Sequence, residues 1–386
     1  MTRSQPTTSF LPESFRKRHN LLLGRASEAV RPLLKMAGSA AARGRVRSPN
    51  EWRRGLIIGH NHMGDVLYRT GSLPVLSEAL PQCRWSFLTS PDSAKVLANN
   101  PHVAEVIPYQ NEDDSWSMSF DQIRELRARR FDAVLCSNSL RYYPDLFLSV
   151  RLGIPNRVSF VHKGMSGLAT HPVPIEFPSP YAAYFRSIVS AVTGKSADWS
   201  LRPQVFPDVE SVQQADAVYE EISGGLPVVA CVLTTRQAHG NWPAKYLIEI
   251  LREARKQRAF TVAFCGAPGD AQVLSELTAS YQHEKSIAAG RLPLLSFAAF
   301  LGRSAALLTL DSGPRHLGNA MSVPVIFARN MSHSRVEAGA YCQTETDIAP
   351  GGEYLNDQEI EIAAAATPIT RAVNKLIEII PRESRA

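Results

Sequence analysis

Asp311, Ser312 and Gly313 come directly after a leucine-rich apolar run that has the content of a buried strand. Pro314 then suits the first turn of a helix, because its fixed φ fits there and that turn needs no N–H donor. A helix that begins after such a turn directs free backbone N–H groups and the positive end of its dipole toward the turn. The pattern therefore predicts an anion site, for phosphate above all. The alternative is an ordinary strand–helix turn in which Asp311 or Ser312 only caps the helix.

A carboxylate, Asp65, follows the first apolar run of the chain, residues 55–59, with Gly64 directly before it. Ligands bind at the carboxyl ends of the strands in an open parallel sheet, so a carboxylate there can act as a general base. The alternative is that Asp65 only caps the next helix. His60 and His62 suggest a metal pair, but nothing else completes a ligand set. We expect them to line a substrate pocket, without a metal.

Thr234, Thr235 and Arg236 end another apolar run, in the second half of the chain. Two hydroxyls and a guanidinium at the carboxyl end of a strand suit a diphosphate, although β-branched residues also finish ordinary strands. The sequence has no Walker A loop, no GxGxxG and no GxSxG. These absences argue against a P-loop NTPase, a dinucleotide-dependent oxidoreductase and an α/β-hydrolase.

The elements that must position these residues alternate along the chain between short apolar runs and helical segments, which indicates α/β structure with parallel sheets. A proline-rich stretch, residues 201–210, separates two such halves. The predicted domains are a basic extension at 1–50, a first domain at 51–205 and a second at 206–386, whose last helix is free to pack back on the first domain. The predicted strands are 55–59, 85–88, 106–107, 131–136, 158–161, 228–233, 261–265, 287–289, 307–310 and 323–328.

The positive charge of the chain is concentrated at its beginning. The formal net charge is +6, yet residues 1–54 hold twelve Lys or Arg against three Glu, a balance of +9, so the remainder carries about −3. The basic extension at 1–50 also contains apolar residues, which suits a helix lying on an anionic membrane; the alternative is a disordered basic tail. No nucleic-acid module is recognisable, so we expect no nucleic acid partner.

The cysteines and the apolar runs predict the compartment. The five cysteines show no CxxC spacing, which favours a reducing environment. No apolar run approaches the roughly 18 residues of a membrane span, and the N-terminus has no signal-peptide core. We expect a cytoplasmic protein, peripheral on the inner face of the plasma membrane if the extension binds there.

Five stretches, taken in order, resemble glycosyltransferase family 9, the ADP-heptose:lipopolysaccharide heptosyltransferases and their relatives. The resemblance covers about residues 55–350. The stretches are GDVLYRTGSLPVLSEALP from Gly64, NPHVAEVI from Asn100, LRARRFDAVL from Leu126, TTRQAHGNWPAKYLIEIL from Thr234 and DSGPRHLGNAMSVPVI from Asp311.

The resemblance implies the GT-B fold, two Rossmann-like parallel-sheet domains that face a central cleft. It implies an inverting transfer of a heptose-like sugar from a nucleotide-sugar, expected to be ADP-linked, to a lipopolysaccharide or other lipid-linked or polysaccharide acceptor, with no cofactor and no metal. Asp65 would be the base, and the acceptor side would include His60, His62 and Gly64. The implied donor-binding residues are Thr234, Thr235, Arg236, Asp311, Ser312, Gly313 and His316.

Two segments depart from the family pattern. Members usually carry a Lys shortly before the Trp-Pro pair, but residues 237–241 contain none. After the last strand, residues 329–333 replace the usual G-P-T-x-P run. These departures keep open a protein of another class, a GT-B protein that binds a nucleotide or glycan without catalysis; a GT-B epimerase fits the matched motifs less well.

Overall fold

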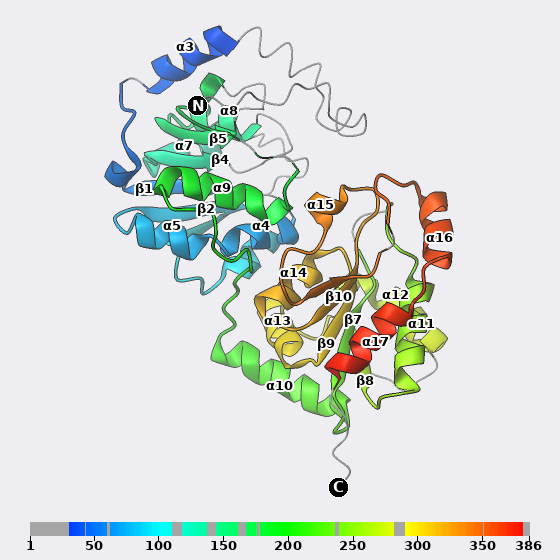
Figure 1. Cartoon of the computed structure of the whole chain (residues 1–386). Helices are drawn as coiled ribbons and strands as arrows, with labels where there is room; N and C mark the ends of the chain where they lie inside the picture. Colours follow the sequence, from blue (N-terminus) through cyan, green and yellow to red (C-terminus); the bar gives the residue numbers. More distant parts are fainter. Residues whose placement is uncertain are drawn as a thin grey trace.

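The computed structural model describes residues 31–42, 44–59, 62–109, 118–136, 144–160, 167–174, 176, 178–235, 239–281, 290–349 and 351–380. In this part of the chain two parallel sheets form two halves (Figure 1). The sheet of the N-terminal half has the order β3-β2-β1-β4-β5-β6, and that of the C-terminal half has the order β11-β10-β9-β7-β8. The predicted fold class, two α/β halves in succession, is therefore confirmed.

The N-terminal half consists of α3 (Arg31–Ala42), η2 (Pro49–Glu51), β1 (Arg54–Ile58), α4 (Met63–Thr70), α5 (Leu73–Ala79), β2 (Arg84–Thr89), α6 (Pro91–Ala94), η3 (Lys95–Leu97), β3 (Glu105–Pro108), α7 (Phe120–Ala128), β4 (Ala133–Cys136), α8 (Pro144–Arg151), β5 (Asn156–Phe160), β6 (His171–Val173) and α9 (Tyr181–Thr193).

The C-terminal half consists of α10 (Val209–Ser223), β7 (Val228–Val232), α11 (Ala244–Arg255), β8 (Thr261–Phe264), η5 (Pro268–Asp270), α12 (Ala271–Tyr281), α13 (Leu294–Arg303), β9 (Ala306–Leu310), α14 (Gly313–Ala320), β10 (Val325–Ala328), α15 (Arg335–Ala338), β11 (Glu345–Asp347), α16 (Asp357–Ala365) and α17 (Thr370–Ile379).

The central strands are apolar along their whole length because helices cover both faces of each sheet. Every residue of β4, β7, β9 and β10 is buried, and β1 is exposed only at its first residue. Strands that are buried on both faces read as continuous apolar runs without alternation, which is why they could be found in the sequence.

The strand order places the candidate residues. In the N-terminal sheet β1 lies between β2 and β4, and in the C-terminal sheet β7 lies between β8 and β9, so each sheet reverses its order beside its first strand. Such a reversal opens a crevice at the carboxyl ends of the strands. Asp65 follows β1, Thr234 follows β7 and Asp311 follows β9, so all three lie at these reversal points.

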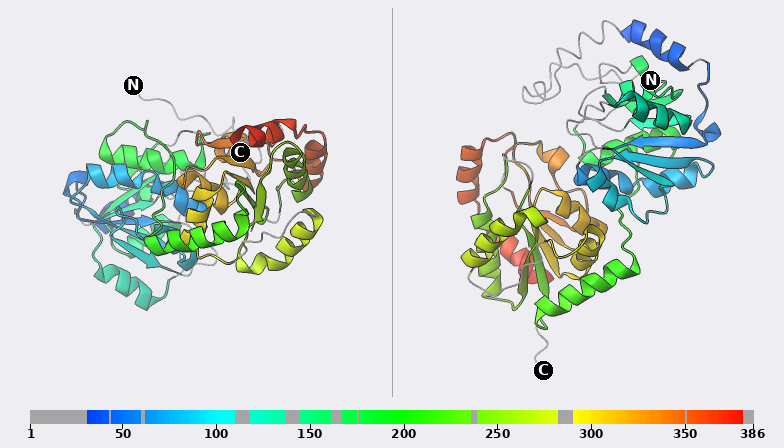
Figure 2. Two further views of the ribbon diagram at one scale, coloured as in Figure 1. Left: turned by 90° about the horizontal axis from the view of Figure 1, so that it is seen from below. Right: turned by 180° about the vertical axis from the view of Figure 1, so that it is seen from behind.

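Two helices differ from the sequence-based expectations. The linker stretch 201–210 ends at Asp208, whose side chain accepts from the backbone N–H of Ser211 at 2.8 Å and so begins α10, a helix that the sequence pattern did not indicate. The last helix, α17, packs against α11 inside the C-terminal half, whereas the sequence left open that it packs back on the first domain. Figure 2 shows α10 at the edge of the C-terminal half.

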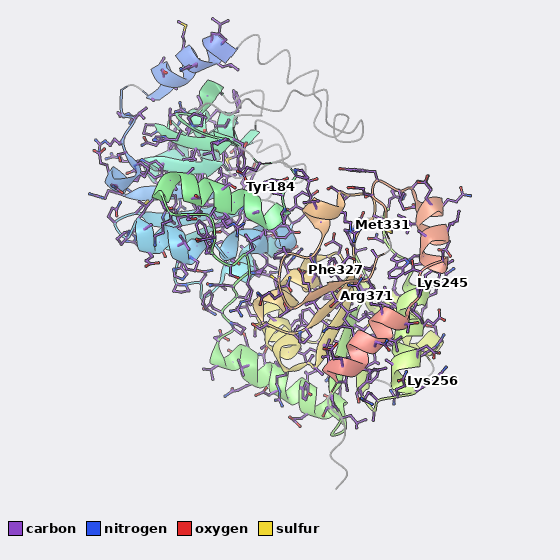
Figure 3. The ribbon with its side chains drawn as sticks, in the orientation of Figure 1. Tyr184, Lys245, Lys256, Phe327, Met331 and Arg371 are labelled. Carbon is purple, nitrogen blue, oxygen red and sulfur yellow. The ribbon has the colours of Figure 1, made fainter. Side chains whose placement is uncertain are left out.

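A hydrogen bond joins the two halves away from the linker. The hydroxyl of Tyr184 in α9 donates to Glu337 Oε1 in α15 at 2.8 Å, and both residues are buried. Figure 3 places Tyr184 on the side of the N-terminal half that faces α15. Within the N-terminal half, the indole N–H of Trp199, in the chain that leaves α9, donates to Ser72 Oγ at 3.1 Å.

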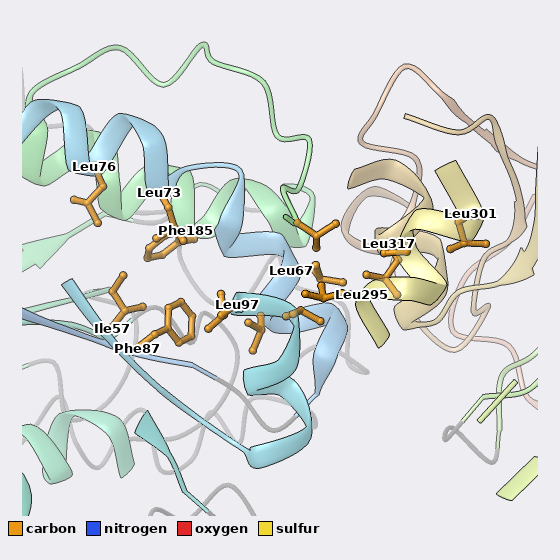
Figure 4. Packing of buried hydrophobic residues seen from close by; sticks show 14 of the residues in the cluster. Ile57, Leu67, Leu73, Leu76, Phe87, Leu97, Phe185, Leu295, Leu301 and Leu317 are labelled. Atoms are coloured by element: carbon orange, nitrogen blue, oxygen red, sulfur yellow. The ribbon is translucent and has the colours of Figure 1, made fainter. Parts of the chain in front are cut away.

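One apolar core runs through both halves. It includes Ile57 of β1, Leu67 of α4, Leu317 of α14 and Leu295 of α13, and the close view shows these side chains as one continuous series (Figure 4). The contact between α4 and α14 is the bridge. Because apolar side chains rather than water fill this boundary, the two helices that carry candidate site residues are held against each other.

No helix among the described residues is long and apolar enough to cross a membrane.

Candidate active site

The N-terminal ends of α4 and α14 meet across the boundary of the two halves, and glycine allows the approach. A Cβ added to Gly64 would lie 2.9 Å from Cδ2 and 3.3 Å from Nε2 of His316. The Cα of Gly313 lies 4.0 Å from the same position. Any larger side chain at residue 64 would therefore push the two helices apart, so the approach of the helix ends requires glycine here.

Asp65 lies in the first turn of α4, directly after this contact, and is half-buried. Its backbone carbonyl accepts a hydrogen bond from the Arg69 guanidinium one turn later. Burial, with a contribution from the negative charges of Asp311 and Asp65, raises the pKa of Tyr68 well above its usual value. Carboxylates from both halves thus act on one buried tyrosine, which places Asp65 and the end of β9 in one electrostatic environment.

Arg315 fixes the beginning of α14. Its guanidinium is fully buried, stacks on the Phe327 ring with Cζ 3.6 Å from the centroid, and donates to Asp311 Oδ1 at 2.7 Å and to the carbonyls of Ala338 and Gly339 at 2.8 and 2.6 Å. Figure 3 labels Phe327 in the C-terminal half.

The second carboxylate of this network, Glu345, is also fully buried and accepts from Arg315 Nε at 2.5 Å. Burial opposes the charge of Arg315, but the carboxylates of Glu345 and Asp311 outweigh it and raise the pKa of Arg315 well above its usual value. Asp311 therefore has a structural partner, and the turn 311–313 is held from one side by a buried cation.

His316 is the residue of α14 that faces α4, and its protonation follows from its contacts. Its Nδ1 lies 2.7 Å from the Tyr341 hydroxyl, its ring centroid lies 4.4 Å from that of Tyr68, and only 3% of its surface is exposed. Burial, reinforced by the positive charge of Arg315, lowers the pKa of His316 well below 6.5. Burial likewise raises the pKa of Tyr341 well above its usual value.

A neutral imidazole and a protonated phenol share one hydrogen bond in either of two tautomers. In one of them the Tyr341 hydroxyl donates to Nδ1 of His316 and the imidazole proton resides on Nε2. Nε2 is the nitrogen that lies near Gly64. In this tautomer His316 offers an N–H donor toward the first turn of α4, where an oxygen of a bound molecule can accept it.

The threonine pair after β7 lies beside this turn, because β7 is hydrogen-bonded to β9. The Thr234 hydroxyl donates to Asp270 Oδ2 at 2.8 Å, and the same oxygen accepts from the backbone N–H of Ala267 at 2.8 Å. Thr234 and Thr235 are half-buried. Asp270 thus orients the Thr234 oxygen, whose lone pairs remain available to a ligand donor.

The other sequence-predicted residues have different outcomes. Ser312 is the N-cap of α14, with φ −150° and ψ 175°, and its side chain makes no capping hydrogen bond. His62 is the exposed N-cap residue of α4. His60 and Arg236 lie outside the described residues. Within the described ranges no group of three His, Cys, Asp or Glu is arranged to hold a metal ion.

Residues 120–338 match the family described as glycosyltransferase family 9 (heptosyltransferase). The chain belongs to this family. A lipopolysaccharide core heptosyltransferase, OpsX of Haemophilus influenzae, is 21% identical over 278 residues, which are 70% of this chain and 77% of the relative.

Solved structures of similar fold agree with this family. A family 9 glycosyltransferase of Veillonella parvula is 17% identical with a TM-score of 0.67, covering 86% of this chain and 100% of that one. The Escherichia coli ADP-heptose lipopolysaccharide heptosyltransferase II is also 17% identical, with a TM-score of 0.66, covering 84% and 98%. The chain is thus a glycosyltransferase with the GT-B fold.

Sequence reasoning missed several residues of this glycosyltransferase that contact the predicted ones. They are Tyr68, Asp270, Arg315, Tyr341 and Glu345. The sequence could have indicated two of them, because residues four apart in a helix lie on the same face. Arg315 is four residues after Asp311, and Tyr68 is four residues after Gly64. No such spacing indicated Tyr341, Glu345 and Asp270, because their partners lie 25, 30 and 36 residues away in the sequence.

We predict that Gly64→Ala impairs the glycosyltransferase through the spacing of α4 and α14. The new methyl group would overlap the buried His316 ring, so the helices must separate by several tenths of an ångström. We expect catalytic efficiency to fall about 10- to 100-fold, measured as sugar transfer under kcat/KM conditions. Gly351→Ala is the control, because a Cβ there meets nothing within 4 Å. Equal activities of the two variants would contradict the prediction.

The stability of the glycosyltransferase should fall in mild acid because of His316. Its lowered pKa means that the folded state keeps the imidazole neutral while the unfolded chain binds a proton below about pH 6.5, so unfolding takes up a proton and stability decreases as the pH falls through that value. Between pH 7.5 and 5.5 the wild type should lose about 1 kcal/mol more unfolding free energy than His316→Gln.

Urea unfolding at the two pH values measures this difference. His102 and His171, whose pKa values burial also lowers, are present in both proteins and cancel in the comparison. An identical loss in the wild type and in His316→Gln would show that His316 does not titrate in this way.

Proposed function

We propose that this glycosyltransferase moves a heptose-like sugar from an ADP-linked donor to a lipopolysaccharide-type glycan acceptor, with inversion at the anomeric carbon. The observation that carries the proposal is the meeting of Asp65 and the beginning of α14 on the two sides of the Gly64–His316 contact. A base and an anion-attracting helix end therefore lie side by side, one from each half. The names of the Haemophilus relative and of the Escherichia coli heptosyltransferase support the choice of sugar and nucleotide.

In the proposed reaction Asp65 accepts the proton of the acceptor hydroxyl while that oxygen attacks the anomeric carbon from the face opposite the diphosphate. The bond from the anomeric carbon to the diphosphate oxygen breaks, and ADP leaves with the electron pair. The backbone N–H groups at Ser312–Gly313 and Nε2–H of His316 are the donors for the charge that grows on the leaving group. These donors take the compensating role without a divalent cation.

We assign the remaining predicted residues to the donor side or to the acceptor side of the proposed site. Residues 51–205 form the acceptor-side domain and residues 206–386 the donor-side domain. Thr234, Thr235 and Arg236 would contact the diphosphate, with Asp270 orienting Thr234. His60 and His62 would lie on the acceptor side, before α4.

We predict that Asp65→Asn abolishes transfer and leaves donor binding intact. Asparagine keeps the size of the side chain but cannot take up the proton, so kcat should fall at least about 10²-fold. Transfer is measured with ADP-heptose and lipopolysaccharide core fragments, and donor binding by the rise in melting temperature with ADP. Asp92→Asn is the control, because Asp92 also occupies the first turn of a helix after a strand of the same sheet. It should behave as the wild type.

Three outcomes would count against parts of the proposal. Near-normal turnover of Asp65→Asn would remove Asp65 as the base. A larger thermal shift with UDP, GDP or CMP than with ADP would contradict the donor nucleotide. A wild type that binds ADP but transfers to no acceptor in a broad panel would favour the non-catalytic binding protein that the departures at 237–241 and 329–333 keep open.

We also infer that the basic extension attaches the enzyme to the anionic inner face of the plasma membrane. Residues 1–30 lie outside the described residues and hold five Lys or Arg against two Glu. Residues 31–42 form α3, and the buried Arg157 of the N-terminal half donates to the Gly38 carbonyl of this helix at 2.6 Å. Removal of α3 would therefore disturb the folded half, so the extension is better tested without it.

We predict that deletion of residues 1–30 lowers binding to anionic vesicles and leaves the melting temperature unchanged. The deletion removes a net charge of +3 and none of the described residues. Co-sedimentation with phosphatidylcholine vesicles containing phosphatidylglycerol measures the effect, and pure phosphatidylcholine vesicles are the control. Binding that is equal with and without residues 1–30 would refute the anchor.

A further inference from the structure

A pocket lined by arginines lies in the N-terminal half, at the amino ends of its strands, whereas the candidate active site lies at their carboxyl ends. It has a volume of about 820 Å³. Arg54 is the first residue of β1, Asp132 directly precedes β4, and Pro155 directly precedes β5. The pocket therefore lies at the amino ends of these strands. Asp65 follows the carboxyl end of β1. The pocket is therefore separate from the site of transfer. Five arginines line it: Arg45, Arg47, Arg54, Arg127 and Arg130.

These arginines have no carboxylate partners among the described residues. Arg45, Arg54 and Arg127 donate only to backbone carbonyls, of Gly153, Arg129 and Arg151. Two arginines of the C-terminal half differ, because carboxylates neutralise them: Arg291 pairs with Glu221 at 2.5 Å, and Arg303 pairs with Asp216 at 2.7 Å and with Glu220 at 2.8 Å. The pocket thus concentrates positive charge that the protein leaves available.

One carboxylate, Asp132, lines the pocket but is already engaged. Its Oδ2 accepts from the backbone N–H of Arg53 at 2.9 Å, and its Oδ1 accepts from the backbone N–H of Arg54 at 3.2 Å. These bonds fix the beginning of β1 beside β4 and orient both oxygens toward the backbone. Asp132 therefore holds the pocket together and counters only one of its five charges.

Arg130 has a backbone conformation that is unfavourable for a residue with a side chain. It follows α7 with φ +53°, in the left-handed region, where a helix end normally has glycine or asparagine. A side chain in this conformation costs backbone energy, and such positions are often associated with function. The Arg130 side chain is exposed and lines the pocket.

Exposed apolar residues on the same segment of chain indicate which source of phosphate the pocket meets. Val46, between two of the pocket arginines, is 46% exposed, and Leu33 and Met36 of α3 are 66% and 69% exposed. Ala41 of α3 also lines the pocket. A soluble phosphate needs no exposed apolar residues, whereas a membrane surface contacts basic and apolar side chains together. In Figure 1 α3 lies at the end of the molecule away from the C-terminal half.

We propose that this arginine pocket binds the phosphate groups of anionic lipid headgroups and so docks the N-terminal half on a membrane surface. The guanidinium fork matches phosphate oxygens two at a time, and five such groups around one hollow repel each other until an anion enters. The proposal depends neither on the sugar that the enzyme transfers nor on residues 1–30. Its failure would leave the proposed reaction and the role of residues 1–30 untouched.

The test uses the full chain and vesicles of phosphatidylcholine with or without phosphatidylglycerol. Arg54→Gln combined with Arg127→Gln removes two pocket charges and no ion pair. We expect binding to the anionic vesicles to fall about 25-fold, about fivefold for each arginine. Arg130→Gly should lower binding about fivefold while the melting temperature stays equal or rises, because glycine suits the left-handed backbone.

The matched control is Arg291→Gln combined with Arg303→Gln, which makes the same change of net charge in the C-terminal half. Its binding to anionic vesicles should stay near that of the wild type. An equal loss in the control and the pocket variant would mean that overall charge decides, and would overturn the pocket. A wild type stabilised by inorganic phosphate through these arginines, with vesicle binding independent of them, would overturn the assignment to lipid.

Discussion

The buried guanidinium of Arg315 is the constraint on which the site depends. A cation removed from water is tolerated only when its donors are satisfied, and here two carboxylates and two carbonyls do so above the Phe327 ring. Loss of the guanidinium would leave the carboxylates of Asp311 and Glu345 without their cation, and an uncompensated buried charge typically costs about 3–5 kcal/mol. Because these partners come from the end of β9, the 338–339 backbone and β11, Arg315 fixes the beginning of α14 relative to the C-terminal sheet.

The position of α14 in turn determines how the halves meet. Since α14 is fixed, His316 presents one face to α4, and only a glycine at residue 64 leaves room for its ring. The apolar core on either side of this contact excludes water, so the imidazole stays neutral, with Tyr341 hydrogen-bonded to its Nδ1. The two halves of the enzyme are therefore joined through packing that also keeps His316 neutral.

The fold was largely predictable because buried parallel strands are continuous apolar runs. Asp311 was found because it directly follows such a run, and Asp65 because it comes soon after another. Contacts between distant segments were not, since no periodicity in α14 reveals that Glu345 lies beneath it. The helix α10 was missed for a related reason: it buries few side chains, so its apolar face is weak in the sequence. The arginine pocket combines residues from separate segments, which only the sheet brings together.

The two segments that depart from the family pattern form one unit. The backbone N–H of Met331 donates to the Gly240 carbonyl at 2.9 Å, and Asn330 Nδ2 donates to the His239 carbonyl at 3.0 Å. Gly240 has φ +83°, and a Cβ there would lie 2.2 Å from Asn330 Oδ1, so the asparagine and the glycine require each other. The residues 330–331 of this unit follow β10. A neighbouring strand of β10 is β9, and β9 leads into the turn 311–313. The described residues of the two departures therefore hold each other in place beside the turn 311–313.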